Sequence, residues 1–394
     1  MTTPPSTCFA ISLKFIGRSL PALCAGLALL LVPRGRSAEQ APLRIAFTGQ
    51  ALVQHDLRKV APEKFSALAG ALRGHDVVFT DLETAIQTGQ GAATREGTFL
   101  HAAGTEIIDC VKDMGFNLLA LANNHAFDMG AEGVLGARAA VAARGITFAG
   151  TGATLAEATA PGVLTTPHGR VALVAFASKI AEGAGATATK PGVNEVRLDE
   201  KTGDINAEDA ARVFAALREA AKTADVVIAY QHDHYWEKDN RMTPAWKPRF
   251  ARACVDAGAT VFVSHGAPLL QGIELYHGRP IFYDLGGLVF HTVTAPGYYL
   301  PEVWEGAIVE AEFAQGRFVS IRMRAVALNE KGEGEPPSPH FYETRGVPTL
   351  AKGAQARGTL DRLAKLSAAF GTKISVDGDT AVIDLSSGSK PLNQ

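Results

Sequence analysis

Short apolar runs that end abruptly in acids, amides or histidines constrain the fold of this chain more than any other feature. The clearest run, Leu118–Leu121, stops at Asn123-Asn124-His125 and is followed by Gly130. Such a run is typical of a buried strand in an open α/β sheet, where the loops at the strand ends surround a crevice. Taken alone, Asn-Asn-His is equally consistent with a polar turn that has a capping amide.

Further apolar runs repeat this pattern across some 230 residues of sequence. Their polar ends, in chain order, are Gln50 with His55 in the loop beyond, Asp81 and Glu83, the segment His232-Asp233-His234, His265, and Asp284 after a predicted hairpin. Core packing does not require such regularity, whereas one shared active-site edge would produce it. The sequence therefore predicts that these side chains meet in one cavity.

Two of these ends carry an i, i+2 spacing that matters chemically. Asp81 and Glu83 can point to the same side of a strand, as a metal site or an acid–base site requires. His232 and His234 can likewise both face one cavity and offer imidazole ligands. The alternatives are a solvated Asp-x-Glu loop and a histidine pair at a strand edge that is hydrogen-bonded to solvent.

Charge and length limit the possible partners and domains. The chain has 394 residues, with 38 basic and 40 acidic side chains and a formal net charge of -2. This balance gives no electrostatic reason to expect a nucleic acid partner. An anionic ligand would have to be held by local groups or by a metal. At roughly 150 residues per domain, the length favours two or three units.

The first 38 residues are different in kind. Lys14 and Arg18 precede the apolar run Leu20–Val32, and small residues follow it up to Ala38. This order predicts a secretory signal peptide over residues 1–38, cleaved near Ala38. The apolar run is shorter than the about 20 residues that a transmembrane helix needs, although a retained membrane anchor is the alternative.

The end of the chain predicts a small appendage. A main domain over residues 42–328 is followed by a Pro- and Gly-rich linker, Gly332–Pro339. Residues 340–390 then read as a helix and a hairpin that turns at Asp377-Gly378. This tail of about 50 residues is too small for much of a core of its own, so we expect it to pack on the main domain.

Several longer motifs point to a known family. They are DLETAI from Asp81, LANNHAFDMGAEG from Leu121, AGTG from Ala149, GIELYHGRPIFYDLGG from Gly272, and KGAQARGTLDRLAKLSAAFGT in the tail. In these motifs the chain resembles the poly-gamma-glutamate capsule-synthesis family, the CapA-like proteins, from about Leu43 to Leu385. The resemblance implies a metallophosphoesterase-like fold, a four-layer α/β/β/α sandwich, here with a small C-terminal α+β extension.

The resemblance also implies a site and its partners. In such a site a pair of divalent cations, Mn, Fe or Zn, polarises the substrate and creates a hydroxide nucleophile. The residues expected there are the metal ligands Glu83, Asn124, His232, His234 and His265, the catalytic residues His125 and Asp81, with His125 as general acid, and the cleft residues Gln50, His55, Asn123, Asp233 and Asp284. The implied partners are an anionic polymer or envelope substrate and a membrane synthase or export complex, with the protein exported to the periplasm or cell surface.

This chain departs from the family pattern at three places, one of which is Gly287, where the family commonly has Asn. Gly49-Gln50 stands where the family usually has Gly-Asp, and Ser264-His265-Gly266-Ala267-Pro268 stands where it has Gly-His-His-Pro-His. One carboxylate and two imidazoles are therefore missing. We retain three hypotheses: an exported metal-dependent hydrolase acting on an ester or amide, a non-catalytic component that binds polymer or aids its export through a degenerate metal cleft, and histidines that are ordinary loop residues.

Overall fold

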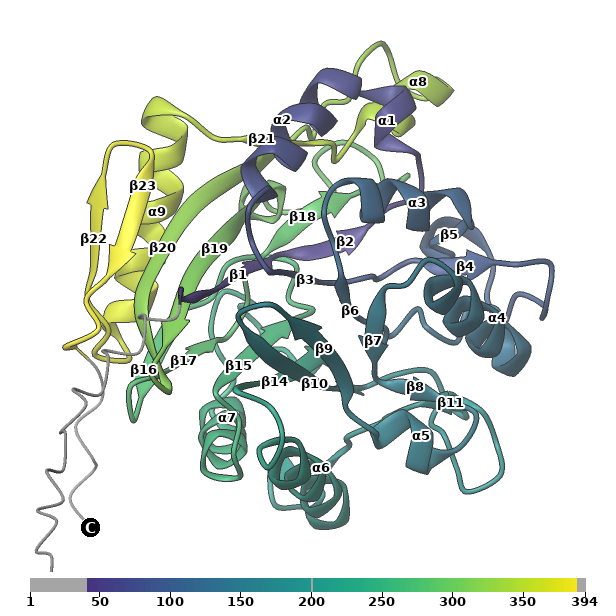
Figure 1. Ribbon diagram of the computed structural model, residues 1–394. Helices are drawn as coiled ribbons and strands as arrows, with labels where there is room; N and C mark the ends of the chain where they lie inside the picture. The colour runs from purple at the N-terminus through teal and green to yellow at the C-terminus, as the bar shows by residue number, and fades with distance from the viewer. Residues whose placement is uncertain (1–40, 200, 388–394) are drawn as a thin grey trace, which may run out of the picture. The chain divides into compact units, whose positions relative to one another are not determined.

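The computed structural model describes residues 41–199 and 201–387. This part of the chain contains a sheet of nine strands and a sheet of six (Figure 1). The larger sheet runs in the order β22 (Ile374–Asp377), β23 (Thr380–Ile383), β20 (Arg317–Leu328), β19 (Glu305–Ala314), β1 (Leu43–Thr48), β3 (Val77–Asp81), β6 (Leu118–Ala120) and β7 (Thr147–Ala149), with β21 (Pro348–Leu350) beside β20.

The smaller sheet runs in the order β16 (Ile273–Tyr276), β17 (Arg279–Phe282), β15 (Val261–His265), β14 (Val226–Asp233), β10 (Gly169–Ser178) and β9 (Gly162–Thr166). Short strand pairs complete the structure: β2 (Gln50–Leu52) with β18 (Gly287–Phe290), β4 (Ala85–Gln87) with β5 (Ala102–Gly104), β8 (Thr151–Gly152) with β11 (Gly192–Val193), and β12 (Leu198–Asp199) with β13 (Asp204–Ile205).

Helices cover the outer faces of both sheets (Figure 1). Those that pack on the larger sheet include α2 (Pro62–Leu72), α3 (Glu106–Asp113) and α4 (Gly130–Ala143). Those that pack on the smaller sheet are α6 (Ala207–Ala220) and α7 (Trp246–Asp256). The remaining described helices are α1 (Leu57–Val60), α5 (Leu155–Thr159), α8 (Pro339–Thr344), α9 (Gly353–Ala368) and the short turns η1 (Gly97–Phe99) and η2 (Pro301–Trp304).

The inner faces of the two sheets form one core. The ring of Phe47 in β1 lies 5.7 Å from that of Phe282 in β17, and Phe79 in β3 lies 5.5 Å from Tyr230 in β14. Side chains alternate along each strand, so Ala46 instead joins the outer core beneath α2 and α3. The predicted α/β/β/α layering is therefore confirmed.

The strands nearest the site are parallel, which explains their continuous apolar sequences. β1, β3, β6 and β7 run parallel in the larger sheet, and β10, β14, β15 and β17 do so in the smaller one. A parallel strand covered on both faces needs apolar residues at every position. Because the strands within each parallel group share one direction, their polar carboxyl ends lie along one edge of the sheet.

Two of these strands run further than the sequence indicated. The change from apolar to polar residues after Tyr230 and after Val263 predicts that the strands end there and that the histidines lie in loops. Instead β14 continues to Asp233 and β15 to His265, and His232 pairs directly with His265. β10 supplies the reason, since it extends to Ser178 and offers hydrogen-bonding partners up to Asp233. Hydrogen bonding between neighbouring strands thus keeps these polar residues in the strands. It also fixes the direction in which each histidine side chain points.

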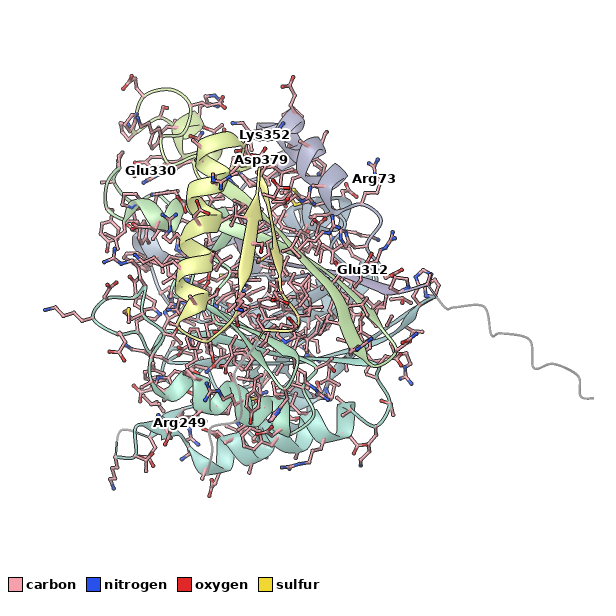
Figure 2. The ribbon with its side chains drawn as sticks, turned by 90° about the vertical axis from the view of Figure 1, so that its left-hand side faces the viewer. Arg73, Arg249, Glu312, Glu330, Lys352 and Asp379 are labelled. Carbon is pink, nitrogen blue, oxygen red and sulfur yellow. The ribbon has the colours of Figure 1, made fainter. Side chains whose placement is uncertain are left out.

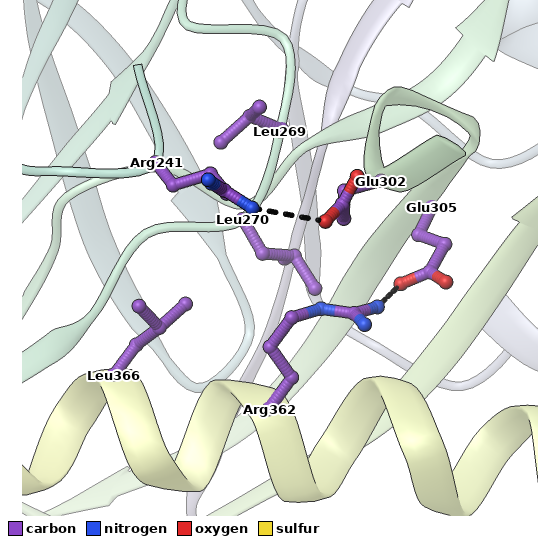
Figure 3. Close-up of a pocket in the computed structure, with 7 residues that line it drawn as sticks. All are labelled: Arg241, Leu269, Leu270, Glu302, Glu305, Arg362 and Leu366. Carbon is purple, nitrogen blue, oxygen red and sulfur yellow. Dashed lines mark hydrogen bonds and ion pairs between the residues drawn. The ribbon is translucent and has the colours of Figure 1, made fainter. Parts of the chain in front are cut away.

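The C-terminal elements extend the larger sheet. β23 pairs with β20, and Leu360 and Leu363 of α9 join the core between the sheets. Figure 2 shows α9 beside the β22–β23 hairpin, both in yellow. The Arg362 side chain of α9 forms an ion pair with Glu305 at the start of β19, in the small pocket drawn in Figure 3.

The predicted signal peptide lies outside the described residues. Within the described range, the helices lack the combination of length and apolar composition that crossing a bilayer requires.

Glycines near the site allow two backbone segments to approach each other closely. The Gln50 N–H donates to the Gly286 carbonyl over 2.9 Å. A Cβ added to Gly49 would lie 2.4 Å from that same carbonyl oxygen, and one added to Gly306 would meet the Gly287 backbone. Side chains cannot relieve these contacts because both partners are backbone. The close approach therefore fixes where Gln50 enters the site.

We predict that Gly49→Ala destabilises the protein by about 1–3 kcal/mol, since overpacking forces the backbone apart. Gly70→Ala is the matched control, because Gly70 lies within α2 and a Cβ there meets nothing within 4 Å. Removing this helical glycine should stabilise by up to about 1 kcal/mol. Urea unfolding measures both values, and equal stabilities for the two variants would contradict the proposed close contact.

Candidate functional site

Three potential metal ligands meet at the strand ends. Glu83 follows β3, His232 lies in β14, and His234 follows two residues later, so both imidazoles extend from one face. One ligand atom of each lies within 4.8 Å of the others, and within the described residues this is the one group of three His, Cys, Asp or Glu side chains that does so. We call Glu83, His232 and His234 the ligand cluster.

The hydrogen bond between His232 and Asp81 orients the cluster. The Nδ1 of His232 lies 3.0 Å from Oδ2 of Asp81, and both side chains are fully buried. An ionised carboxylate only accepts, so Nδ1 carries the proton and Nε2 keeps its lone pair. That Nε2 faces Nε2 of His234 at 3.0 Å and Oε1 of Glu83 at 3.6 Å. A carboxylate behind a ligand histidine is the usual support of a metal-binding imidazole.

The electrostatics of the cluster fit a cation. Burial, with the nearby Asp81, Asp284 and Asp128 charges, raises the pKa of Glu83 well above its ordinary value. Burial also lowers the pKa values of His232 and His234 well below theirs, which keeps both imidazoles neutral. Among the described residues no Lys or Arg forms an ion pair with Glu83. One carboxylate and two neutral imidazoles without a counter-charge suit a divalent cation.

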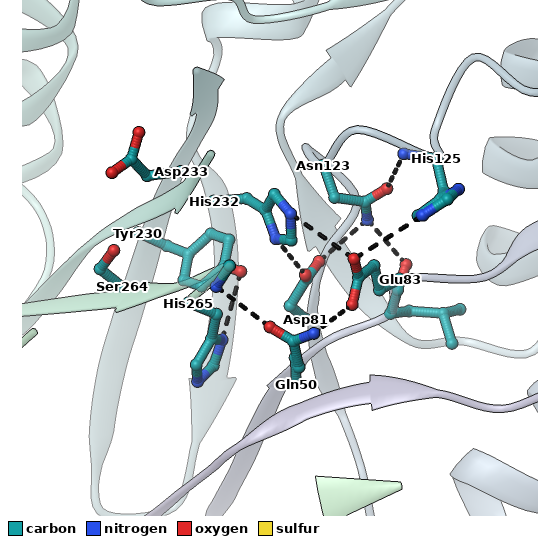
Figure 4. A network of polar contacts seen from close by, with 12 residues as sticks. Gln50, Asp81, Glu83, Asn123, His125, Tyr230, His232, Asp233, Ser264 and His265 are labelled. Carbon is teal, nitrogen blue, oxygen red and sulfur yellow. Dashed lines mark hydrogen bonds and ion pairs between the residues drawn. The ribbon is translucent and has the colours of Figure 1, made fainter. Parts of the chain in front are cut away.

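Asn123 connects the loop after β6 to the end of β3 (Figure 4). Its amide nitrogen donates to Oδ1 of Asp81 over 3.0 Å and to the Leu82 carbonyl over 2.9 Å. Its oxygen accepts the His125 N–H over 3.0 Å. Asn123 therefore fixes both the acid behind the cluster and the imidazole in front of it.

His125 forms a dyad with Asp128. Its Nδ1 lies 2.7 Å from Oδ2 of Asp128, and its Nε2 lies 3.9 Å from Oε1 of Glu83. Arg95 closes the arrangement, because its guanidinium pairs with the other Asp128 oxygen at 2.7 Å and donates to the Asn124 carbonyl at 3.0 Å. An imidazole held from behind with its far nitrogen toward the cluster has the geometry of a general acid or base.

Gln50 occupies the position at which the resemblance leads one to expect a carboxylate. Its amide nitrogen donates to Oε2 of Glu83, and its oxygen accepts the Gly266 N–H over 3.1 Å. Both ends of the amide are therefore engaged, and a hydrogen-bond donor faces Glu83 on this side.

The remaining predicted residues lie around the cluster rather than in it. His265 points its Nδ1 at the Tyr230 hydroxyl, 3.2 Å away, while its buried Nε2 has no hydrogen-bond partner among the described residues. Asp233, on the opposite face of β14 from His232, pairs with the buried Lys247 at 3.0 Å. Asp284 accepts the backbone N–H groups of Ala267 and Gly286, and burial raises its pKa to about 7.

His55 is not brought to the cluster. It packs against His291, with ring centroids 5.1 Å apart, and its backbone N–H donates to Nδ1 of that residue. Asn124 does line the site, and its side-chain oxygen is buried without a hydrogen-bond partner among the described residues.

A cavity of about 210 Å³ opens in front of the ligand cluster. Several of its lining residues escaped the sequence analysis: Arg95, Phe99, His101, Trp236, Phe290 and Tyr299. The i, i+3 spacing of His125 and Asp128 offered a signal for the dyad. His101 and the aromatic residues carried none, because each comes from a loop or strand end without a distinctive pattern.

Comparison with known proteins gives the family. Residues 44–292 match the family described as "Bacterial capsule synthesis protein PGA_cap". The chain belongs to this family. That membership confirms the predicted resemblance and connects the chain with capsule synthesis, a cell-envelope process.

The chain is also similar to individual proteins. Protein y4sH of Sinorhizobium fredii is 27% identical over 86% of this chain and 92% of its own length. The PGA biosynthesis protein CapA of Bacillus subtilis is 27% identical over 66% of each chain. Among solved structures, a phosphatase of Mycoplasma pneumoniae aligns with a TM-score of 0.44 at 12% identity, over 73% of this chain and 94% of that one.

We predict that His232→Ala and His234→Ala each abolish stoichiometric binding of a divalent cation, since each removes one of three ligands. Elemental analysis after dialysis against Mn, Fe or Zn measures this. His340→Ala is the control, because that imidazole is 61% exposed and lies on α8. Unchanged metal content in both cluster variants would contradict the assignment.

Proposed function

We propose that this member of the PGA_cap family is a metal-dependent hydrolase that cleaves an ester or amide bond in an anionic polymer of the cell envelope. The observation that carries the proposal is the His125–Asp128 dyad, whose free nitrogen faces the ligand cluster at 3.9 Å from Glu83. A hydrolase needs a site for the reacting bond between such a group and an electrophilic centre.

The ligand cluster would hold a divalent cation through Glu83, His232 and His234. When bound, such a cation polarises a carbonyl or phosphoryl oxygen and supplies a nucleophile at neutral pH. Asp81 keeps the His232 lone pair directed at the cluster, so we assign it a positioning role rather than direct contact with the substrate. Asn123 holds Asp81 and His125 in one frame.

His125 would act as the general acid. Asp128 accepts from its Nδ1 and stabilises the protonated ring, which leaves Nε2–H to donate to the leaving group. Arg95 holds Asp128 from the other side and prevents the carboxylate from rotating away. The dyad thus provides proton transfer next to the cluster without itself being a ligand.

The arrangement around Gln50 supports one cation rather than two. The Gln50 amide N–H donates to Oε2 of Glu83. This oxygen is therefore already hydrogen-bonded on the side where a second cation would bind it. The Gln50 oxygen is already used by the Gly266 N–H. We therefore propose a single-cation site.

The second candidate is a non-catalytic component that binds polymer or assists its export. The same Gln50 arrangement favours it, because loss of a second cation would leave a cleft that still binds ligand. In both cases we propose that residues 1–38 direct export to the periplasm or cell surface, and that a membrane synthase or export complex is the partner.

We predict that His125→Gln lowers metal-dependent turnover of a chromogenic ester by about 100- to 10,000-fold, the usual contribution of a general acid. Metal content should be unchanged, since His125 lies outside the cluster. His340→Ala serves as the control. Wild-type protein that binds metal but shows no chelator-sensitive turnover would favour the binding component over the hydrolase.

We predict one bound cation per wild-type chain and a second, weaker site in Gln50→Asp, which replaces the donating amide by a carboxylate. Titration calorimetry with Mn²⁺ or Zn²⁺ measures the stoichiometry. Gln54→Asp adds the same charge four residues further along the chain, outside the residues that line the cavity, and should leave the stoichiometry at one. Two cations on the wild-type protein would overturn the single-cation proposal.

A further inference from the structure

The walls of the cavity in front of the ligand cluster have a composition that the metal chemistry does not require. Phe99 and Trp236 line it, yet their side chains remain 47% and 45% exposed. Trp236 is nevertheless fixed in place, since its indole N–H donates to the Asp233 carbonyl over 3.0 Å and its ring packs at a tilt against that of His234, with the centroids 4.9 Å apart. A large ring that is exposed but held in one orientation is ready to pack against a ligand.

Uncharged polar atoms stand between the aromatic residues and the dyad. His101 is only 4% exposed, and its Nδ1 has no hydrogen-bond partner among the described residues. Its ring lies 4.7 Å from that of His125, at the reacting end of the cavity. The Asn124 side-chain oxygen is likewise buried and unpartnered within the described part of the chain. Buried polar atoms without partners are costly, so these positions indicate hydrogen bonds to a bound ligand.

The charge of the cavity argues against a densely anionic ligand at this end. Arg95 is the one Lys or Arg among the lining residues, and its guanidinium is already engaged by Asp128 and the Asn124 carbonyl. Glu83, which also lines the cavity, is an acid and so adds no positively charged group. A γ-glutamyl chain carries a carboxylate on every residue, and apart from the cation proposed for the ligand cluster the residues that line this cavity offer no free Lys or Arg for further carboxylates.

The volume of the cavity sets the size of the ligand group. Its volume of about 210 Å³ gives room for a ring-sized group, and because the cavity is open to solvent the rest of a polymer can continue outside it. Aromatic surface, unpartnered neutral acceptors and ring-sized volume are together matched by a sugar, whose C–H face is apolar and whose edge carries hydroxyl groups.

We propose that this cavity is a saccharide subsite that binds one uncharged sugar ring of a glycan, packed on Phe99 and Trp236 and donating hydroxyl hydrogen bonds to His101 and Asn124. The inference that the bound sugar is the unit next to the cleaved bond rests on the proposed function. It narrows the substrate from envelope polymers in general to a glycan whose anionic group lies next to a neutral ring.

The test measures binding of two probes to the full-length protein by saturation-transfer NMR and by tryptophan fluorescence. The probes are a neutral N-acetylglucosamine tetramer and a γ-glutamyl tetramer. We expect the saccharide to bind and the γ-glutamyl tetramer not to compete with it. Trp236→Ala and Phe99→Ala should each weaken saccharide binding by about tenfold or more, as truncation of an aromatic anchor typically does.

Three controls separate the possible outcomes. Trp236→Phe keeps a ring and should retain most of the affinity, whereas Val319→Ala and Val382→Ala remove exposed apolar side chains outside the cavity and should have no effect. Metal content, measured on every variant, should stay at the wild-type value. Saccharide binding that is unaffected by Trp236→Ala, or γ-glutamyl binding that Trp236→Ala abolishes, would overturn the subsite.

The same data distinguish this proposal from the proposed function. Saccharide binding without chelator-sensitive hydrolysis would support the subsite and reject the hydrolase. Chelator-sensitive hydrolysis without saccharide binding would support the hydrolase and reject the subsite.

Discussion

The buried hydrogen bond between His232 and Asp81 is the interaction on which the site depends. It joins β14 of one sheet to β3 of the other at the edge where both sheets end. Because both side chains are fully buried, neither has water as an alternative partner, and breaking the bond would leave a polar group unsatisfied. The bond also selects the tautomer of His232, and through it the direction of the lone pair that faces Glu83 and His234.

Around this bond the site divides into parts with different physical tasks. Asn123 ties together two strand ends of the larger sheet, and Gln50 accepts a hydrogen bond from the loop after β15 of the smaller sheet. The close backbone contacts at Gly49 and Gly306 leave the chain little freedom there. The ligand cluster concentrates neutral nitrogens and one carboxylate, whereas the His125–Asp128 dyad stands opposite it. The aromatic walls of the cavity lie further out. The residues that hold the site rigid are therefore the most deeply buried, and the side chains that would contact a ligand lie nearest the surface.

Much of the fold was predictable from local patterns. Continuous apolar runs marked the parallel strands, since a strand covered on both faces excludes polar residues from its length. The hairpins at His277-Gly278 and at Asp377-Gly378 formed where turn residues interrupt apolar segments. The ends of β14 and β15 were less predictable, because pairing with β10 extended a ladder through residues whose sequence resembles a loop.

The sequence by itself determined the apolar strands and the polar residues at their ends, because these follow from periodicity and turn chemistry. It also determined the family, because contiguous motifs carry the resemblance, and that resemblance implied the four-layer architecture. Only the tertiary structure decided which of the polar residues meet. His232 and Asp233 are adjacent in the chain, yet a pleated strand sends one to the cluster and the other to Lys247. His101 and Trp236 reach one cavity from distant loops, and no local pattern encodes a contact made across two sheets.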